Sequence, residues 1–226
     1  MLLSFCSLVE ADQRKEFSFS QKPPPLRHIS AKKQRFYDLL LFPTQKTYNT
    51  LNSRYLRIKD ELQIGTQTGE IVRLKSIYKV QSDKALLLAI KPHPVSITLA
   101  QAAMESAWGT SRFFREANNV FGMWSKNPKD KRIAAGEKRG GKRTIWLRKF
   151  DTIEESIWEY YKTIGRAKAY KNLREYRYES DDVYKIVKGL DKYSELGQEY
   201  VDTIATLIWH NDLTQYDIKE SKNEID

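Results

Sequence analysis

The segment from residue 96 to residue 124 constrains this chain more than any other part of it. It opens with small and apolar residues, some of which recur at helical spacing: Ile97, Ala100, Met104 and Ala107. Such a stripe predicts a helix that packs against a core. Glu105 falls in the last turn of this helix, just before Trp108 and Gly109.

The place of Glu105 is unfavourable for an ionised carboxylate. A helix presents partial negative charge at its C-terminal end, and Trp108 one turn on would exclude water. Both effects raise the pKa of a carboxyl group, which suits a general acid that works near neutral pH. We therefore expect Glu105 to be an acid catalyst for breaking glycosidic bonds. The plainer alternative is a surface glutamate in a helix ion pair, but the small neighbours Ala102, Ala103 and Ser106 leave room for a substrate.

Length and charge narrow the class of protein. With 226 residues, 40% of them hydrophobic, the chain can form one sizeable domain with at most a small helical appendage. Its formal net charge of +10 favours a polyanionic partner. Nucleic acid, anionic lipid surfaces and bacterial wall polymers all meet this description, and a solvated basic face is the plain alternative.

The cysteine and histidine content argues against a metal site. Cys6 is the single cysteine, which excludes an internal disulfide and a cysteine-based zinc site. The histidines His28, His93 and His210 have no ligand spacing. We expect no metal.

The start of the chain has an apolar run and a Val9-Glu10-Ala11 sequence that would suit signal peptidase, but no basic residues before them. We expect an exported protein, with an ordinary N-terminus as the alternative. No stretch approaches the roughly 20 apolar residues of a membrane span, so we expect none.

We expect four parts along the chain: a signal remnant and linker (1–29), a helical N-terminal subdomain (30–91), the unit that holds Glu105 (92–217) and a charged tail (218–226). In the subdomain, helices are expected from Ser30 to residue 41, from Pro43 to residue 62, and over residues 70–79 and 82–89. Pro43 is expected to end the first helix and open the second.

The sequence of the unit that holds Glu105 predicts more helices and one hairpin. Ser111 should cap a helix that ends at a turn formed by Asn118 and Asn119. A β-hairpin is expected between residues 123 and 150, around a Gly-Gly pair at 140–141. Later helices should begin at a capping box over residues 152–155, at Ser180, and at about Gly197. The fold class expected is α+β, mostly helical with a small hairpin.

Several motifs carry a family resemblance. Glu-Ser-Ala-Trp-Gly-Thr-Ser at 105–111 and Asn-Asn-Val-Phe-Gly at 118–122 resemble the signature of the bacterial endo-β-N-acetylglucosaminidases, peptidoglycan hydrolases of the autolysin and flagellar-rod type. Residues 147–156 resemble the Phe-Arg-x-Tyr segment of that family and the helix after it. Residues 193–200 are similar to its late Tyr-Ala-Thr-Asp-Pro-x-Tyr segment, without the proline and with one extra residue. From residue 33 onward the chain resembles the Bax proteins, a Gram-negative branch of the family.

The resemblance, which covers about residues 31–217, implies a lysozyme-like fold. A helical lobe would hold Glu105, and a hairpin lobe would lie across a groove from it. It also implies hydrolysis of the β-1,4 bond between N-acetylglucosamine and N-acetylmuramic acid, without a cofactor, in the periplasm or cell envelope. In this framework residues 92–217 are a glucosaminidase-like catalytic domain and peptidoglycan strands are the substrate.

Two further catalytic positions follow from the resemblance. Tyr193 matches the active-site tyrosine of the family. Glu137 falls near its hairpin carboxylate, although somewhat closer to Leu147 than the family pattern places it, and Asp130 is the competing candidate. Glycoside hydrolysis usually needs such a second carboxylate, unless the acetamido group of the substrate replaces it.

Aromatic and amide side chains near Glu105 are candidates for binding sugars. Trp108, Phe121 and Trp124 could stack on pyranose rings, although aromatics at this spacing are more often core, and Trp124 is the one expected to face the groove. Asn118 and Asn119 could hydrogen-bond sugar hydroxyl or acetamido groups, or simply permit a left-handed turn.

A basic run surrounds the expected hairpin: Lys138, Arg139, Lys142, Arg143, Arg148 and Lys149. It would attract the carboxylates of wall glycan. No recognised nucleic-acid module accompanies it, so we expect no nucleic acid. Two rival functions stay open. One is a lytic transglycosylase, although the usual Gly-Leu-Met-Gln-like segment is absent, and the other is a non-catalytic wall-binding protein.

Overall fold

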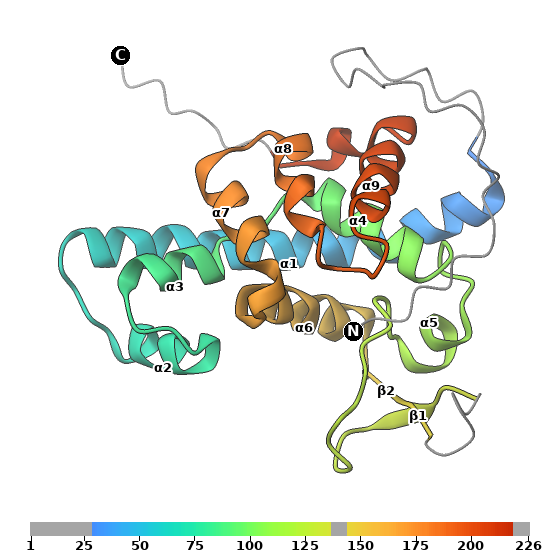
Figure 1. The fold of residues 1–226 in the computed structure, drawn as a ribbon, viewed down its shortest axis with the longest axis horizontal. Coiled ribbons are helices and arrows are strands. Elements are labelled where there is room, and N and C mark those ends of the chain that lie inside the picture. The colour runs from blue at the N-terminus through green and yellow to red at the C-terminus, as the bar shows by residue number, and fades with distance from the viewer. Residues whose placement is uncertain (1–28, 137–143, 219–226) are drawn as a thin grey trace.

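Helices make up most of the structure, a computed structural model that describes residues 29–136 and 144–218. The N-terminal helices are α1 (Ala31–Gln63), α2 (Gly69–Tyr78), α3 (Asp83–Ile90), α4 (Val95–Glu105) and α5 (Arg112–Ala117). Two short strands follow, β1 (Arg132–Ala134) and β2 (Trp146–Arg148). The remaining elements are α6 (Ile153–Arg166), η2 (Lys168–Tyr170), α7 (Lys171–Glu179), α8 (Val183–Val187), η3 (Lys188–Leu190), α9 (Gln198–His210) and η4 (Leu213–Tyr216). Figure 1 shows the two strands to one side of the helices. The predicted fold class is confirmed.

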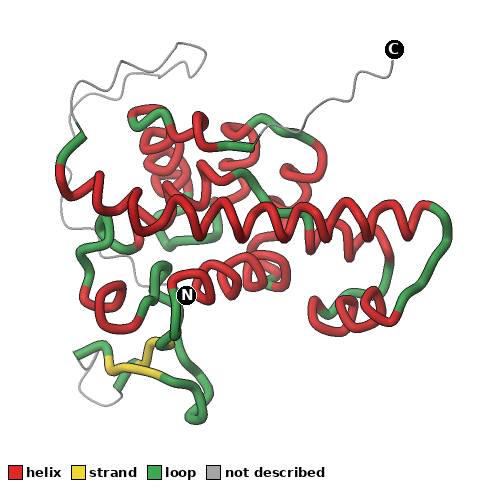
Figure 2. Tube along the Cα trace, turned by 180° about the vertical axis from the view of Figure 1, so that it is seen from behind, coloured by secondary structure: helices red, strands yellow, loops and turns green. Residues whose placement is uncertain are grey.

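Helix α1 runs along the length of the molecule as one continuous element (Figure 2). Ser30 caps it, as expected, by accepting a hydrogen bond from the backbone N–H of Lys33 at 3.4 Å. The predicted break at Pro43 is wrong, because Pro43 lies inside the helix. Proline removes the backbone bond to the carbonyl four residues earlier, here that of Leu39. Leu39 is 39% exposed and Phe42 is 72% exposed, so this side of the helix faces water, which can solvate the freed carbonyl.

Helix α4 lies at the centre of the helical part (Figure 1) and is buried on every side over residues 95–103. It packs against α1, α9 and η4. Its N-terminal end has no cap from its own sequence, because Pro94 has no side-chain donor or acceptor. Asp217, far along the chain, supplies the cap by accepting hydrogen bonds from the backbone N–H and the hydroxyl of Ser96, each at 2.7 Å.

The predicted hairpin is confirmed in its two arms. β1 pairs with β2 in antiparallel register, with Ile133 opposite Leu147. Trp124 forms a further bridge to Leu147, which joins the chain after α5 to the same small sheet. The expected turn at Gly140 and Gly141 lies outside the described residues.

The C-terminal half holds two confirmed helix starts and one corrected start. Gly197 precedes α9 as its N-cap residue, as expected. Thr152 caps α6 by accepting from the backbone N–H of Glu155 at 3.1 Å, as the capping box predicts. Ser180 does not open α8, because Asp182 accepts from the first backbone N–H groups of that helix instead. Ser180 ends α7, a helix that was not predicted from the sequence. α7 buries only Leu173 and Arg177, so it has almost no apolar periodicity to detect.

Two clusters of buried side chains form the interior. The larger one surrounds α4, and the smaller one lies among α2, α3 and the second half of α1. Helix α1 contributes to both, with Leu51 in the larger cluster and Tyr55 in the smaller one. The division of the chain near residue 92 stays a prediction. Within the two described ranges, no helix is both long and apolar enough to cross a membrane.

Candidate active site

Glu105 is the last residue of α4, as the sequence predicts. The hydroxyl of Ser106 ends the helix: it donates to the carbonyl of Ala102 at 2.6 Å and accepts from the backbone N–H of Gly109 at 2.8 Å. Ala107, Trp108 and Gly109 then follow with φ angles of 51°, 59° and 74°. Residues other than glycine rarely adopt this left-handed backbone. The carboxyl group therefore sits beside a strained turn that the surrounding structure must hold in place.

Trp108 holds this turn against α1. Its ring meets Phe36 edge-on at 5.2 Å between centroids and Tyr37 at 6.1 Å. The ammonium group of Lys33 lies 4.6 Å from the centre of the ring. A ring packed in this way fixes the turn to α1. The structure therefore does not support the two predicted roles of Trp108, which were to stack on a sugar ring and to exclude water from Glu105.

Tyrosines provide the surroundings of Glu105 instead. The hydroxyl of Tyr200, from α9, donates to Oε1 of Glu105 at 3.0 Å. Tyr193 stacks on Tyr200 at 5.1 Å and 18°, and Tyr170 lies 5.5 Å from Tyr193. Burial raises the pKa of Glu105 to about 7, while the bond from Tyr200 acts in the opposite direction. A substantial fraction of Glu105 is therefore protonated at neutral pH, as a general acid requires.

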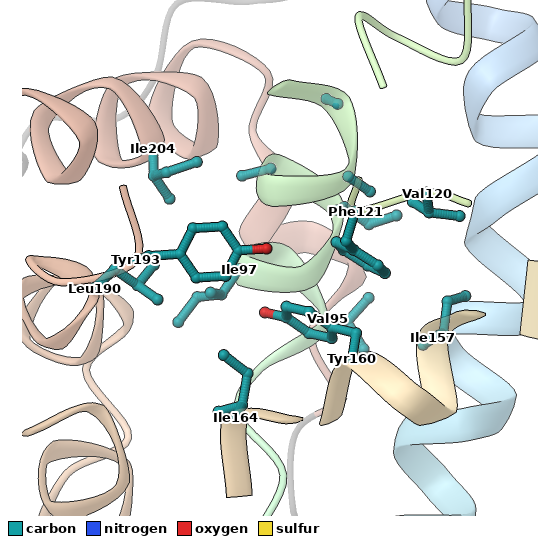
Figure 3. Close-up of a cluster of buried hydrophobic side chains, with 14 of the residues drawn as sticks. Val95, Ile97, Val120, Phe121, Ile157, Tyr160, Ile164, Leu190, Tyr193 and Ile204 are labelled. Atoms are coloured by element: carbon teal, nitrogen blue, oxygen red, sulfur yellow. The ribbon is translucent and has the colours of Figure 1, made fainter. Parts of the chain in front are cut away.

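A cavity of about 190 Å³ lies next to these tyrosines. Its walls come from the hairpin side and from the helical side: Phe121, Met123, Trp124, Lys126, Arg148, Tyr160, Thr163, Ile164, Tyr170 and Tyr193. Figure 3 shows Tyr193 extending toward Phe121 and Tyr160 within this region. Among the described residues, the hydroxyl of Tyr193 and the indole N–H of Trp124 are buried without a hydrogen-bond partner. Buried polar atoms are usually paired, so these two donors are unusual among the residues that line the cavity. Away from the cavity lining, Thr44, Thr47, Arg177 and Asp191 also have a buried side-chain atom without a partner among the described residues.

Tyr193 and Trp124 thus lie together at the cavity, and Tyr193 reaches the partner of Glu105 through its stack on Tyr200. Their roles toward substrate stay predictions. Phe121 also lines the cavity, but it is fully buried and stacks on Tyr160 at 4.0 Å. It is part of the core beneath the cavity, and the structure does not support its prediction as an open sugar platform.

Asn118 and Asn119 fasten the hairpin lobe to α5. Asn118 has a left-handed φ of 47° and donates to the carbonyls of Phe150 and Asp151, each at 3.1 Å. Asn119 is 1% exposed and donates to the carbonyls of Met123, at 2.9 Å, and Arg148, at 2.8 Å. Because their amides are used in this way, the structure does not support the predicted sugar contacts. The alternative, a left-handed turn, is found at Asn118 and not at Asn119.

The second carboxylate is not located by the structure. Glu137 lies outside the described residues. Asp130 accepts from the hydroxyl of Ser125 at 2.9 Å, within its own loop before β1. Of the basic run, Lys138, Arg139, Lys142 and Arg143 also lie outside the described residues. Arg148 is described and donates to Glu159 of α6 at 2.7 Å, so its charge is partly neutralised by a partner.

Two residues that serve Glu105 were not predicted from the sequence. Tyr200 ends the motif at residues 193–200 but was given no role, and Gln101, which donates to the hydroxyl of Tyr200 at 3.0 Å, was not singled out. A signal for Gln101 existed, because it is a polar residue within an apolar run, four positions before Glu105 and therefore on the same helix face. Among the residues described, no group of three or more His, Cys, Asp or Glu side chains could hold a metal ion.

Known proteins share the sequence pattern around this site. The Glucosaminidase family model, described as mannosyl-glycoprotein endo-beta-N-acetylglucosaminidase, matches residues 86–213. Exo-glucosaminidase LytG of Bacillus subtilis (strain 168) is 28% identical over 173 residues, which are 69% of this chain and 58% of that protein. Protein bax of Escherichia coli (strain K12) is 32% identical over 120 residues, 48% of this chain and 41% of that protein. The chain therefore spans about half the length of these curated relatives.

The fold also matches a solved structure. The catalytic domain of the autolysin Auto from Listeria monocytogenes aligns with a TM-score of 0.54 and 19% identity, over 85% of this chain and 92% of that one. At this level of identity the likeness concerns the fold alone.

Proposed function

This chain belongs to the glucosaminidase family, and on that premise we propose that it is an endo-β-N-acetylglucosaminidase of peptidoglycan. It hydrolyses the β-1,4 bond between N-acetylglucosamine and N-acetylmuramic acid, with Glu105 as general acid. The observation that carries this proposal is the buried carboxyl at the end of α4, whose pKa is raised to about 7 by burial and which receives a hydrogen bond from Tyr200.

Glu105 acts at the leaving group. In its protonated form it donates a proton to the glycosidic oxygen as the bond to the sugar breaks. The carboxylate that remains is stabilised by the hydroxyl of Tyr200. Water then completes the hydrolysis at the sugar carbon.

Tyr193 and Trp124 contact the sugar in this proposal. Both present a buried donor without a protein partner at the cavity, and a glycan offers hydroxyl and acetamido oxygens as acceptors. The second catalytic group is Glu137 or Asp130 on the hairpin side, or the acetamido group of the substrate itself.

The site of action is the cell envelope, reached by export. Peptidoglycan lies there, and a similar protein, of Bacillus subtilis, is named an exo-glucosaminidase. The net charge of +10 supports binding to a wall polymer that carries carboxylates.

Digestion of purified peptidoglycan tests the proposed bond. The soluble products are reduced with borohydride and the new glycan ends identified by mass spectrometry. Reduced N-acetylglucosamine ends on chains of several disaccharides support the proposal. Anhydromuramic ends would identify the protein as a lytic transglycosylase instead. Reduced N-acetylmuramic acid ends would identify it as a muramidase, and the absence of new ends would identify it as a wall-binding protein. Release of single sugars from chain ends would contradict the endo mode.

A further inference from the structure

A line of hydrogen bonds leads from Glu105 into the interior of the protein. Tyr200 donates to Glu105, and the amide Nε2 of Gln101 lies 3.0 Å from the same tyrosine hydroxyl. The hydroxyl of Tyr160 donates to Oε1 of Gln101. It also lies 2.9 Å from Nε2 of His93. Gln101 and His93 are fully buried and Tyr160 is almost so, so water does not compete with these bonds.

Arg177 of α7 closes the inner end of this line. It is 2% exposed, and its guanidinium lies 3.4 Å from Nδ1 of His93. It also donates to the carbonyls of Leu88 and Ala89 at 3.1 and 3.0 Å. These carbonyls belong to the last turn of α3, where the helix presents partial negative charge that offsets the buried cation.

The direction of every bond follows from Arg177. A guanidinium can only donate, so Nδ1 of His93 accepts from it. Burial and the charge of Arg177 lower the pKa of His93 well below its ordinary value. The ring is therefore neutral, and its one proton is on Nε2. That nitrogen donates to Tyr160 and lies 3.1 Å from the hydroxyl of Thr98.

The remaining bonds then have one arrangement. Tyr160 accepts from His93, so its own proton goes to Oε1 of Gln101, which fixes the orientation of the amide. Nε2 of Gln101 donates to Tyr200, so the lone pair of Tyr200 is occupied and its proton points to Oε1 of Glu105.

We propose that Gln101, Tyr160, His93 and Arg177 are positioning residues, which hold the hydroxyl of Tyr200 as a permanent donor to Glu105. The inference rests on the proposed function in one respect, namely that Glu105 loses its proton during catalysis. A hydroxyl that is free to rotate would accept from protonated Glu105 as readily as it would donate to the carboxylate. A protonated carboxyl can still accept from the fixed donor through its carbonyl oxygen, but the bond to the charged carboxylate is stronger. The fixed donor therefore favours the carboxylate, and so it assists release of the proton to the substrate.

The other groups around Glu105 allow its titration to be interpreted. Tyr200 faces it from α9, Tyr193 from the turn before α9, and Tyr170 from η2, and burial raises the pKa of all three hydroxyls. They are neutral across the range in which Glu105 titrates. Charged groups on the other elements packed against α4 have hydrogen-bond partners of their own. Lys33 of α1 donates a hydrogen bond to Asn211. Asp217, after η4, is bonded to Ser96 at the opposite end of α4.

On α8, which also packs against α4, the titratable side chains are Tyr184 and Lys185. Burial, the largest cause, raises the pKa of Tyr184, so it too is neutral while Glu105 titrates.

The experiment measures the carboxyl of Glu105 directly, without an activity assay. The protein is labelled with carboxyl-¹³C glutamate, and the Glu105 signal is assigned by its loss in Glu105→Gln. We expect a titration midpoint near pH 7 in the unaltered protein. Tyr200→Phe should raise it by about one pH unit, since a bond to a charged group is lost.

Two variants at a distance test the line itself. Gln101→Met and Tyr160→Phe leave Tyr200 in place but free its hydroxyl, so each should raise the midpoint by less than Tyr200→Phe does. Tyr55→Phe removes a buried tyrosine hydroxyl from the smaller cluster and should leave the midpoint unchanged.

The inference would be overturned if both distant variants titrate at the same midpoint as the unaltered protein while Tyr200→Phe shifts the midpoint upward. If the midpoints shift as expected but the protein does not cleave peptidoglycan, the proposed function fails and the positioning line stands.

Discussion

At the scale of single residues, Glu105 shows how a buried carboxyl group destabilises the fold that holds it. Its pKa rises from 4.5 to about 7, with burial as the cause. Between these two values the folded state binds a proton that the unfolded state has released. Stability that is present below pH 4.5 is therefore lost as the pH rises toward 7.

Replacing this carboxyl should stabilise the protein in a pH-dependent way. We expect Glu105→Gln to raise the free energy of unfolding by up to about 3 kcal/mol at pH 8 and by little at pH 4. Urea unfolding of both proteins at the two pH values measures the difference. An equal effect at both values would show that the change acts through packing and not through the charge.

The same titration should appear in catalysis. Because the acid must be protonated, we expect kcat/KM on soluble glycan to fall above about pH 7, by roughly tenfold per pH unit. The pH profile of initial rates measures this limb. A rate that stays constant up to about pH 9 would exclude Glu105, with its pKa of about 7, as the proton donor.

At the scale of elements, α4 depends on a cap from the far end of the chain. Asp217 accepts two hydrogen bonds from Ser96 at the positive end of the helix. We expect Asp217→Ala to lower the free energy of unfolding by about 1–2 kcal/mol. Asp181→Ala is the matched control, because the side chain of Asp181 is 99% exposed. Thermal unfolding compares them, and equal melting temperatures would contradict the capping role.

A substitution in helix α1 should have the opposite effect and raise the stability of the protein. Pro43 leaves the carbonyl of Leu39 without its helical partner. Pro43→Ala should restore that bond and stabilise the protein by about 1–2 kcal/mol, after allowance for the greater entropy of the unfolded chain. Urea unfolding measures the gain. A loss of stability would mean that Pro43 stabilises α1 by contacts of its own ring.

The sequence predicted these elements well where a periodic apolar face or a cap was present. The helix that ends at Glu105 and the cap at Thr152 both appear as expected. The predicted single apolar stripe of α4 is wrong, because the helix is buried on every side over residues 95–103 and Ala107 is exposed beyond its end. Prediction from the sequence failed where a tertiary contact determines whether an element forms or where it ends. The continuity of α1 through Pro43 depends on packing on one side and water on the other, and α7 is held by a buried Arg177 that no apolar pattern reveals.

At the scale of the whole molecule, the candidate site could be predicted in part. The sequence placed Glu105 at a helix end and predicted a raised pKa, and both agree with the structure. It assigned the dry surroundings to Trp108, whereas the tyrosines of the C-terminal third supply them. Periodicity tells which side of a helix is buried, but not which distant segment covers it. It therefore could not connect Tyr200 with Glu105, although the motif at residues 193–200 ends at Tyr200.

Loss of wall cleavage on neutralising one carboxyl tests the central claim most directly. Peptidoglycan is incubated with the unaltered protein, with Glu105→Gln, and with Glu116→Gln, which changes an exposed glutamate on the nearby α5. Release of N-acetylglucosamine reducing ends is followed over time, with wall binding measured by co-sedimentation. We predict that Glu105→Gln binds the wall but releases ends at least about a hundredfold more slowly, while Glu116→Gln matches the unaltered protein. Cleavage by Glu105→Gln at the rate of the unaltered protein would contradict the assignment of Glu105 as the general acid.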